Sequence, residues 1–376
     1  MKEVIKISNP FLSIAIPTWN RCEYLRNNIL NLIQQVEFLH LDNVEIFISD
    51  NASTDGTEAM CRQFTDDYSY INHHRHDKNY GANFNFESVL KLAQGDYIWL
   101  LGDDDLLAPN VIKKVIADIQ TYHPDVVLGG ALDSDTLKKE THLSIDKIVL
   151  TNYSIFAKES LIELAGKMSG VIFKKESIMP ILQLAEKIIL QTKTPWPHLA
   201  WLILLLNNPE KKCLLLPYGI NLLVSENWHN LLFSGTKLID IHFIAQQKLI
   251  IALNPNLSHL FYVNLINQIA VKRISILIKC VVYSTYLDSY SEPLKLALSF
   301  LPNLLGLKNK FYFMVFLILP LCIPAVMRKI ILNVVAYFPG SMLLKLKQTL
   351  RNLKKSKFIL NNKADNLREH FDVNQL

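Results

Sequence analysis

The stretch that decides the fold is Gly95-Asp96-Tyr97-Ile98-Trp99-Leu100-Leu101-Gly102-Asp103-Asp104-Asp105-Leu106-Leu107. It begins as an apolar run typical of a buried strand and ends in three consecutive carboxylates. Like charges this close repel one another, and they persist mainly where a cation or hydrogen-bond donors compensate them. The acids therefore indicate a divalent cation and, through it, a phosphorylated ligand. The alternative is an acidic turn that caps a helix beginning near Pro109.

Strand-like and helix-like segments alternate around this stretch. We expect strands at 11–16, 44–49, 71–76 and 125–129 in addition to the one that begins at Gly95, and helices at 21–35, 58–68, 109–122 and a segment ending at Ala93. The connections are short. This alternation predicts an α/β fold with a mostly parallel sheet that is covered on both faces.

Three polar clusters each follow one of the expected strands. They are Thr18 with Asn20 and Arg21, the segment 50–57, and the acids at 103–105. In a parallel sheet, ligands bind beyond the carboxyl ends of the strands, where these clusters would meet. Their convergence favours a ligand site over an acidic turn.

Four segments of the first 130 residues match a known family in order and spacing. They are Ile14-Ala15-Ile16-Pro17-Thr18-Trp19-Asn20-Arg21, residues 49–57, Asn79-Tyr80-Gly81 and residues 95–107. In these segments the chain resembles the family 2 glycosyltransferases, which have the nucleotide-sugar-binding, Rossmann-like GT-A fold. Within the family it is most similar to bacterial O-antigen and capsule enzymes of the abequosyltransferase type.

The resemblance implies roles for individual residues. Asp104, with Asp105, would hold Mg²⁺ or Mn²⁺ against the diphosphate of a nucleotide sugar. Asp50 would accept hydrogen bonds from the nucleobase or ribose, because a carboxylate accepts from N–H and O–H donors. The full set expected to bind the nucleotide sugar is Pro17, Thr18, Asn20, Arg21, Asp50, Asn51, Ser53, Asp55, Gly81 and Asp103.

The chain departs from the family pattern at two places. Where the family commonly reads Asp-x-Asp-Asp, Gly102 takes the place of the first acid. The resemblance also implies an inverting enzyme with an acidic base after the central sheet, but residues 194–201 contain no acid. His198 lies in that stretch and is the expected catalytic base, because histidine titrates near neutral pH. The alternative is that His198 is a packed residue and that an acid elsewhere, such as Glu226, is the base.

Three histidines, His73, His74 and His76, lie close together in the expected strand at 71–76. Alternation along a strand places His73 on the opposite face from the other two. A zinc site needs three or four converging ligands. We therefore expect these histidines to have structural roles.

Composition bears on the second half of the chain. Half of the 376 residues are hydrophobic, mean hydropathy is +0.17, and the excess lies after residue 196. The uncharged run at 311–327 is flanked by Lys and Arg and contains two prolines. This pattern predicts an interfacial or re-entrant segment, with a buried helical hairpin as the alternative. We expect a GT-A catalytic domain at 1–235 and an apolar, helical, membrane-associating region at 236–376.

Net charge bears on the expected partners, and the cysteines and the first ten residues bear on the expected location. The net charge of +5 is modest, so nucleic acid is not an expected partner. The five cysteines are scattered without a Cys-x-x-Cys pair, and the first ten residues lack the apolar run of a secretory signal. Both observations favour a cytoplasmic protein, peripheral or monotopic on the inner face of the plasma membrane.

These features together predict a metal-dependent hexosyl- or deoxyhexosyltransferase. It would move a sugar from a nucleotide-diphosphate donor to a lipid-linked oligosaccharide acceptor in the synthesis of a surface polysaccharide. Gly102 and the missing base acid leave a second class open, which is a catalytically inactive nucleotide-sugar-binding or assembly protein. A third is a soluble protein-modifying glycosyltransferase.

Overall fold

The computed structural model describes residues 9–133, 149–151, 165, 167–223, 246–259, 261, 262 and 265. Contacts along the chain separate it into two compact units. The described residues belong almost entirely to the first unit, Met1–Asn227 with Leu249–Leu265. The run at 311–327, Glu226 and the expected boundary at residue 235 lie outside the described residues. Among those described, no helix has the length and apolar character needed to cross a membrane.

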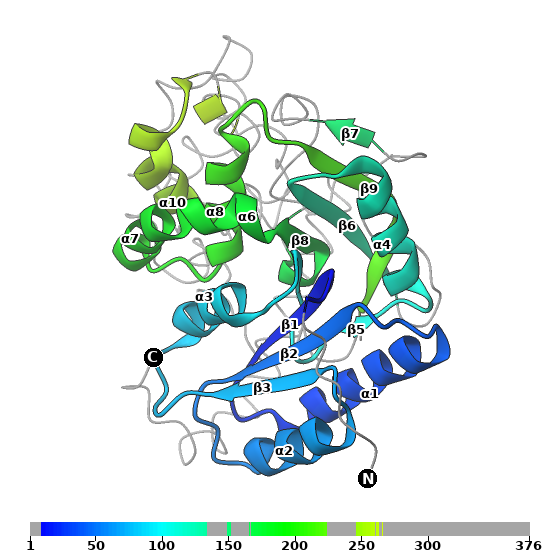
Figure 1. The fold of residues 1–376 in the computed structure, drawn as a ribbon. Coiled ribbons are helices and arrows are strands. Elements are labelled where there is room, and N and C mark those ends of the chain that lie inside the picture. Colours follow the sequence, from blue (N-terminus) through cyan, green and yellow to red (C-terminus); the bar gives the residue numbers. More distant parts are fainter. Residues whose placement is uncertain are drawn as a thin grey trace, which may run out of the picture. The chain divides into compact units, whose positions relative to one another are not determined.

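A single mixed sheet forms the centre of this unit (Figure 1). Its strands are β1 (Leu12–Thr18), β2 (Val44–Asp50), β3 (Ile71–Arg75), β4 (Tyr97–Leu100), β5 (Leu106–Leu107), β6 (Val126–Asp133), β7 (Val149–Thr151), β8 (Val171–Lys174) and β9 (Cys213–Leu223). The order is β3-β2-β1-β4-β8-β6-β9-β5, with β7 paired to β9. The pairings make β1, β2, β3, β4, β6 and β9 run in one direction, against β5, β7 and β8.

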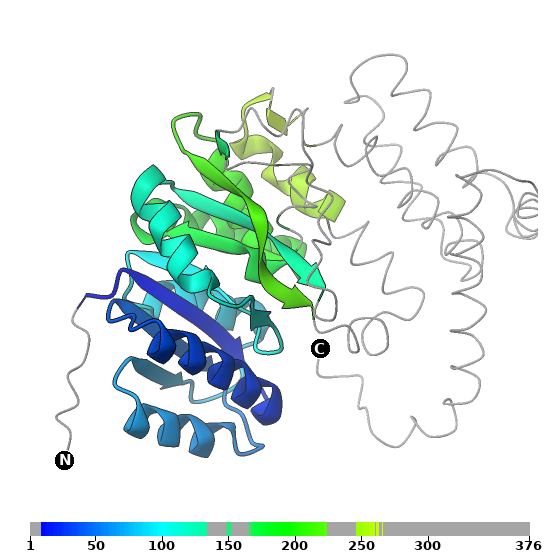
Figure 2. The ribbon, with the colours of Figure 1, turned by 90° about the vertical axis from the view of Figure 1, so that its right-hand side faces the viewer.

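Helices cover both faces of the sheet. The helices of the described residues are α1 (Cys22–Phe38), α2 (Thr57–Asp67), α3 (Ala82–Leu92), α4 (Val111–Tyr122), α6 (Lys175–Ile178), α7 (Leu182–Thr192), α8 (Pro197–Leu206) and α10 (Gln246–Leu253), with short 3-10 turns at Met168–Gly170, Met179–Ile181 and Asn254–Asn256. Helices α1 and α2 lie side by side on one face, and α3 packs on the other against β1 and β2 (Figures 1 and 2).

The alternation of side chains along β1 explains this layering. Leu12, Ile14 and Ile16 are fully buried and share one core with apolar side chains of α1, α2 and α4. Side chains of neighbouring strand residues point to opposite faces. Every residue of β1 is buried, as expected for a strand covered on both sides.

The predicted parallel alternation is correct for β1 to β4 and incomplete beyond. The strand expected at 125–129 exists as β6, but it does not neighbour β4. Instead β8 lies between them and pairs antiparallel with both. The reversal follows from pairing between segments distant in sequence, and an apolar run such as Val171–Lys174 does not reveal its direction.

Gly95 allows a close backbone approach at the entry to β4. Its N–H donates to the Ser13 hydroxyl at 2.7 Å. A Cβ at this position would lie 2.5 Å from the Ser13 backbone nitrogen. Only glycine fits there without a shift of β1 or β4, and the close contact sets where β4 begins beside β1.

The carboxyl ends of β1, β2 and β3 meet at one edge of the sheet. The parallel register places Thr18 beside Asp50 and Asp50 beside Arg75. Strand β4 runs parallel on the other side of β1, so the three-acid turn that follows it reaches the same edge. The predicted convergence of polar loops is therefore confirmed by the topology.

Candidate active site

Arg21 joins two of the three acids after β4. Its Nη1 lies 2.8 Å from Asp103 Oδ1 and 2.9 Å from Asp104 Oδ2. The Thr18 hydroxyl donates to the other Asp103 oxygen at 2.8 Å. Asp103 is buried, whereas the Asp104 side chain is 22% exposed. The loops after β1 and β4 are thus joined by charge-assisted hydrogen bonds, with Asp104 on the solvent side.

Burial and charge act against each other in this cluster. Burial alone would lower the pKa of Arg21, but the charges and hydrogen bonds of Asp103 and Asp104 outweigh it and raise that pKa. Burial also raises the pKa of Asp103, while the charge and hydrogen bond of Arg21 act in the opposite direction. The ionised state of the buried carboxylate thus depends on Arg21.

Asp105 points away from this cluster into the protein. Its carboxylate accepts a hydrogen bond from the Ser169 hydroxyl, and the same hydroxyl accepts the Gly102 N–H at 2.9 Å. Burial raises the pKa of Asp105 to about 6, against the effect of Ser169. The Asn28 amide donates to the carbonyls of Gly102 and Asp105 at 2.9 and 2.5 Å. This geometry suits a residue that shapes the acidic turn, and the metal-ligand role of Asp105 stays a prediction.

Asp50, at the end of β2, is fully buried yet incompletely satisfied. Its Oδ1 accepts the Ser53 N–H at 2.8 Å. Its Oδ2 has no hydrogen-bond partner among the described residues and lies 3.5 Å from Arg75 Nε and 4.0 Å from His73 Nε2. Buried polar atoms without partners are rare in folded proteins. This oxygen is therefore a candidate acceptor for a ligand N–H or O–H.

The loop after β2 is ordered by side chains of the loop after β1. The Asn20 N–H donates to the Ser53 hydroxyl at 2.9 Å, and Asn20 Oδ1 accepts the Thr54 N–H at 2.7 Å. Asp55 Oδ2 accepts the Cys22 N–H at the start of α1, at 3.0 Å. These bonds hold the two loops together at the edge of the sheet.

Asn51 connects this edge to the start of α3. Its Nδ2 donates to Asn79 Oδ1 at 2.7 Å and to the Gly81 carbonyl at 3.2 Å, and its Oδ1 accepts the Tyr80 N–H at 3.0 Å. Gly81 has φ +90°, a left-handed value that glycine adopts without strain. The Asn79-Tyr80-Gly81 segment therefore belongs to the same site as Asp50.

Arg75 is a candidate site residue that the sequence interpretation missed. Its Nη2 donates to the Ser53 carbonyl at 2.9 Å, and its Nε lies 3.0 Å from Glu58 Oε2. Its position beside Asp50 follows from the parallel register of β2 and β3. This position could have been inferred from the sequence, because Arg75 is the last residue of β3 as Asp50 is the last residue of β2, and the two strands are parallel. Asn28 and Ser169 gave no comparable signal, since they lie far in sequence from the acids.

His198 lies at the start of α8 and is buried. Its Nε2 is 2.9 Å from the Ala165 carbonyl, to which it must donate. Burial lowers the pKa of His198 to about 4, although that hydrogen bond acts in the opposite direction. A neutral, enclosed ring with one nitrogen engaged is a weak general base. The base role of His198 stays a prediction, and this geometry does not favour it.

Thr194, four residues before His198, contacts the start of α3. Its carbonyl accepts a hydrogen bond from the Asn83 side-chain amide at 2.9 Å.

His198→Gln tests both interpretations. The folded-state pKa of about 4 lies below the ordinary 6.5. Stability from the neutral ring is therefore complete above pH 6.5 and is lost as pH falls toward 4. We expect the variant to melt at a lower temperature at neutral pH, to lose this part of the acid dependence, and to keep more than about a tenth of its activity. A general base contributes ~10²–10⁴ in rate. A loss of that size with an unchanged fold would identify His198 as the base.

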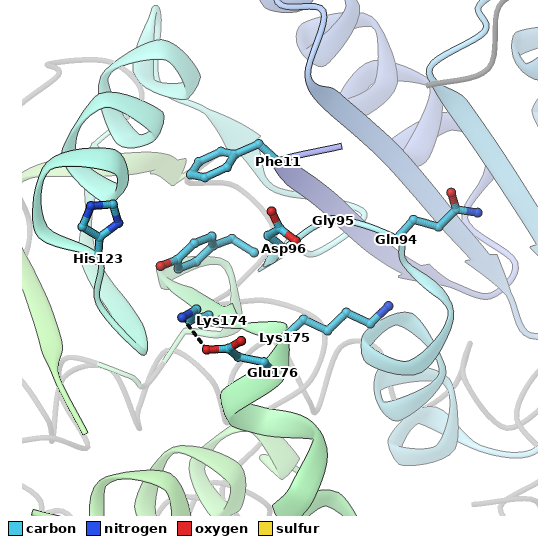
Figure 3. A pocket seen from close by; sticks show the side chains of 9 residues that line it. Phe11, Gln94, Gly95, Asp96, His123, Lys174, Lys175 and Glu176 are labelled. Carbon is cyan, nitrogen blue, oxygen red and sulfur yellow. Dashed lines mark ion pairs between the residues drawn. The ribbon is translucent and has the colours of Figure 1, made fainter. Parts of the chain in front are cut away.

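A separate cleft of about 570 Å³ opens at the opposite edge of the sheet (Figure 3). It lies at the amino ends of β1 and β4, and its lining includes Phe11, Asp96, Tyr97 and His123. Its lysines have partners within the chain: Lys174 pairs with Glu176 at 2.5 Å, and Lys175 donates to the Ala93 carbonyl at 2.5 Å. Among the described residues that line the cleft, no buried side-chain polar atom lacks a hydrogen-bond partner, unlike Asp50 Oδ2.

The acids after β4 fit a divalent cation that is shared with a phosphate. In the described part of the chain, no three His, Cys, Asp or Glu side chains are grouped to hold a metal by themselves. Both oxygens of Asp103 have protein partners, and Asp104 is the more exposed acid. Mg²⁺ is commonly bound through one or two carboxylates together with substrate phosphates. Asp104 provides a carboxylate of this kind.

Comparisons with known proteins agree with this geometry. Residues 13–175 match the sequence profile of Glycosyl transferase family 2. Over these residues the chain is similar to the family 2 glycosyltransferases. The matched segment contains β1 to β4, the acidic turn and β8, and so every candidate residue described above except His198.

Two bacterial relatives are similar over part of the chain. The abequosyltransferase RfbV of Salmonella typhimurium is 46% identical over 112 residues, which are 30% of this chain and 32% of that protein. A Campylobacter jejuni enzyme named GalNAc(5)-diNAcBac-PP-undecaprenol beta-1,3-glucosyltransferase is 28% identical over 197 residues, 50% of this chain and 60% of that protein. The aligned part spans 32%, 40% and 35% of three of the curated relatives. The chain therefore spans about a third to two fifths of the length of these three relatives.

The fold is also similar to that of S. aureus TarS. A crystal structure of TarS residues 1–349 superposes with a TM-score of 0.51 at 13% identity, covering 87% of this chain and 93% of that one. A second TarS structure superposes with a TM-score of 0.56, covering 88% of this chain and 56% of that one. At this identity the likeness concerns the fold, and it supports the GT-A-like arrangement of a mixed, mostly parallel sheet.

Proposed function

We propose that this protein transfers a sugar from a nucleotide-diphosphate donor, which binds across the carboxyl ends of β1, β2 and β4. The observation that carries the proposal is the buried Oδ2 of Asp50, which has no hydrogen-bond partner among the described residues, at the same edge as the solvent-side carboxylate of Asp104. One acid suits a donor group of the nucleoside and the other suits a cation on the diphosphate. Both lie in the segment that matches family 2.

The remaining residues divide between the two ends of the nucleotide. Asp50, with Arg75 beside it, would receive the base or ribose, while Thr18, Asn20 and Ser53 hold the surrounding loops in place. Asn51, Asp55 and Gly81 keep the adjoining turns in position. Pro17 lies one residue before the carboxyl end of β1. In this proposal its backbone would contact the nucleotide base.

The diphosphate would lie near Arg21 and Asp104. A divalent cation bound by Asp104, Mg²⁺ or Mn²⁺, supplies positive charge that offsets the charge developing on the leaving nucleotide. Arg21 carries a fixed positive charge within the same cluster. Asp103 and Asp105 shape the turn that presents Asp104.

We further propose a lipid-linked glycan as the acceptor, as in the synthesis of O-antigen or capsule. The name of the Campylobacter relative includes an undecaprenol-linked glycan, and the Salmonella relative is an abequosyltransferase. The apolar run at 311–327 with its basic flanks suits contact with a membrane surface. In this proposal residues 1–235 catalyse transfer of a hexose or deoxyhexose, and 236–376 associate with the inner face of the plasma membrane.

A thermal-shift screen of the full chain with nucleotides and nucleotide sugars in Mn²⁺ tests the donor. A ligand at 100 times its Kd stabilises the native state by about 2.7 kcal/mol, so one nucleotide class should raise the melting temperature. Slow hydrolysis of the same donor without acceptor should accompany the shift. A shift without hydrolysis or transfer would indicate the inactive binding protein, and no shift with any nucleotide would refute the proposal.

The membrane part has its own readout in the same preparation. The full chain should float with vesicles that contain anionic lipid, and a chain lacking residues 296–376 should stay in the soluble fraction while keeping its nucleotide shift. If the full chain stays soluble at low salt, the membrane proposal is wrong and the protein-modifying transferase is favoured.

A further inference from the structure

Arg21 stands where a cation shared by two carboxylates would stand. A single nitrogen, Nη1, contacts Asp103 Oδ1 at 2.8 Å and Asp104 Oδ2 at 2.9 Å. The guanidinium supplies the positive charge that adjacent acids need in a folded protein. Among the described residues this is the ion pair that Asp104 makes. Another cation that binds Asp104 at this oxygen meets the positive charge of Arg21 at 2.9 Å.

The two acids are held with unequal strength. Asp103 is buried, and the Thr18 hydroxyl engages its second oxygen at 2.8 Å. The side chain of Asp104 is 22% exposed, against 8% for Asp103. An exposed ion pair with one contact is weak, whereas a buried carboxylate with two partners is costly to uncover. Arg21 therefore releases Asp104 more easily than Asp103.

Arg21 also has a second favourable contact close by. Its guanidinium carbon lies 5.4 Å from the centroid of the Tyr24 ring, within the range of a cation–π interaction. Tyr24 is 41% exposed and lies in the first turn of α1. The guanidinium is partly exposed as well. Arg21 therefore has two favourable contacts, with Asp103 and with the Tyr24 ring, that do not involve Asp104.

We propose that Arg21 is a displaceable internal counter-ion of Asp104, competing with the divalent cation until a nucleoside diphosphate arrives. With the diphosphate present, Arg21 pairs with a phosphate oxygen and leaves Asp104 to the cation. Arginine suits this exchange because its planar fork can bind either a carboxylate or a phosphate. Cation and nucleotide then bind cooperatively. This inference rests on the proposed donor site and makes Arg21 a diphosphate-binding residue within it.

Binding of Mn²⁺ to the full chain, measured by the loss of its free electron paramagnetic resonance signal, tests the competition directly. Without nucleotide, Arg21→Ala should bind Mn²⁺ at least about five-fold more tightly than wild type, the lower end of typical coupling between sites. With Mn²⁺ present, the same variant should bind UDP or GDP more weakly. Arg21→Lys keeps a charge without the fork and should fall between the two.

A matched control is Arg26→Ala, which removes an arginine of the first turns of α1, just after Arg21, from a solvent-exposed pair with Glu23. It should leave both affinities unchanged. Melting curves identify variants whose fold is damaged, and Arg21→Lys keeps the test valid if Arg21→Ala unfolds. Unchanged or weaker Mn²⁺ binding by folded Arg21 variants overturns the inference while nucleotide binding by wild type leaves the donor site intact. If wild type binds none of UDP, GDP, CDP, ADP and dTDP with Mn²⁺, the donor-site proposal and this inference both fail.

Discussion

Asp104→Ala is expected to lower the rate of sugar transfer by ~10²–10³ or more, the usual loss when a group that stabilises transition-state charge is removed. The expectation follows from its place in the cluster. Asp104 is the solvent-side acid of the turn, and both oxygens of Asp103 are already engaged by Thr18 and Arg21. No neighbouring carboxylate is free to replace it there. The fold should survive, because Arg21 keeps its pair with the buried Asp103.

The measurements that check this prediction are turnover, Mn²⁺ binding in the presence of nucleotide, and the melting temperature. Asp96→Ala is the matched control, since Asp96 is an exposed acid that precedes β4 at the opposite edge of the sheet. It should keep full activity. Wild-type turnover in Asp104→Ala, or full wild-type activity in excess EDTA, would show that the cation does not act through this residue.

The local elements could be predicted from sequence because their apolar spacing is strong. The strand expected at 44–49 is β2 (Val44–Asp50), and the helix expected at 109–122 is α4 (Val111–Tyr122). The position of β8 could not be predicted. Its insertion between β4 and β6 depends on partners about 45 to 75 residues away, and a short apolar run is compatible with either direction.

The candidate site shows the same division. Convergence of Thr18, Asp50 and Asp103 follows from polar residues after parallel strands, and the structure brings them to one edge. Alternation in β3 was also interpreted correctly, because His73 faces Asp50 while the rings of His74 and His76 lie 4.8 Å apart. These inferences need only the period of a strand and the direction of the sheet.

The orientation of His198 needed information that its segment does not contain. All ten residues of α8 are buried, and nine of them are apolar. Such a helix has no polar face that would show which side meets a cleft. The sequence therefore placed His198 near the expected base position, while packing turned its ring toward the Ala165 carbonyl.

Asp50→Asn is expected to weaken nucleotide binding by roughly 1.5–3 kcal/mol, the range for a hydrogen bond to a charged group. That loss corresponds to about 10–150-fold in Kd. The variant keeps an oxygen that can accept the Ser53 N–H, so the loop after β2 retains its main anchor. It removes the negative charge that lies 3.5 Å from Arg75 Nε. It also replaces Oδ2, which has no hydrogen-bond partner among the described residues, with an NH₂ group that cannot accept. The measured loss should therefore report the ligand contacts of Asp50 together with the loss of its charge beside Arg75.

Calorimetry with the nucleotide identified by thermal shift, on wild type and variant at the same Mn²⁺ concentration, measures this loss. Asp42→Asn is the control, because Asp42 is an exposed acid just before the amino end of β2. Asp42→Asn also replaces a carboxylate with an amide, just before β2 and at the edge of the sheet away from the site. Equal nucleotide affinity in wild type and Asp50→Asn would mean that the buried Oδ2 takes no part in recognition. Its role would then be confined to Arg75, which is already held by Glu58 at 3.0 Å and by the Ser53 carbonyl. A loss in Asp50→Asn alone would assign the nucleoside end of the donor to the carboxyl end of β2.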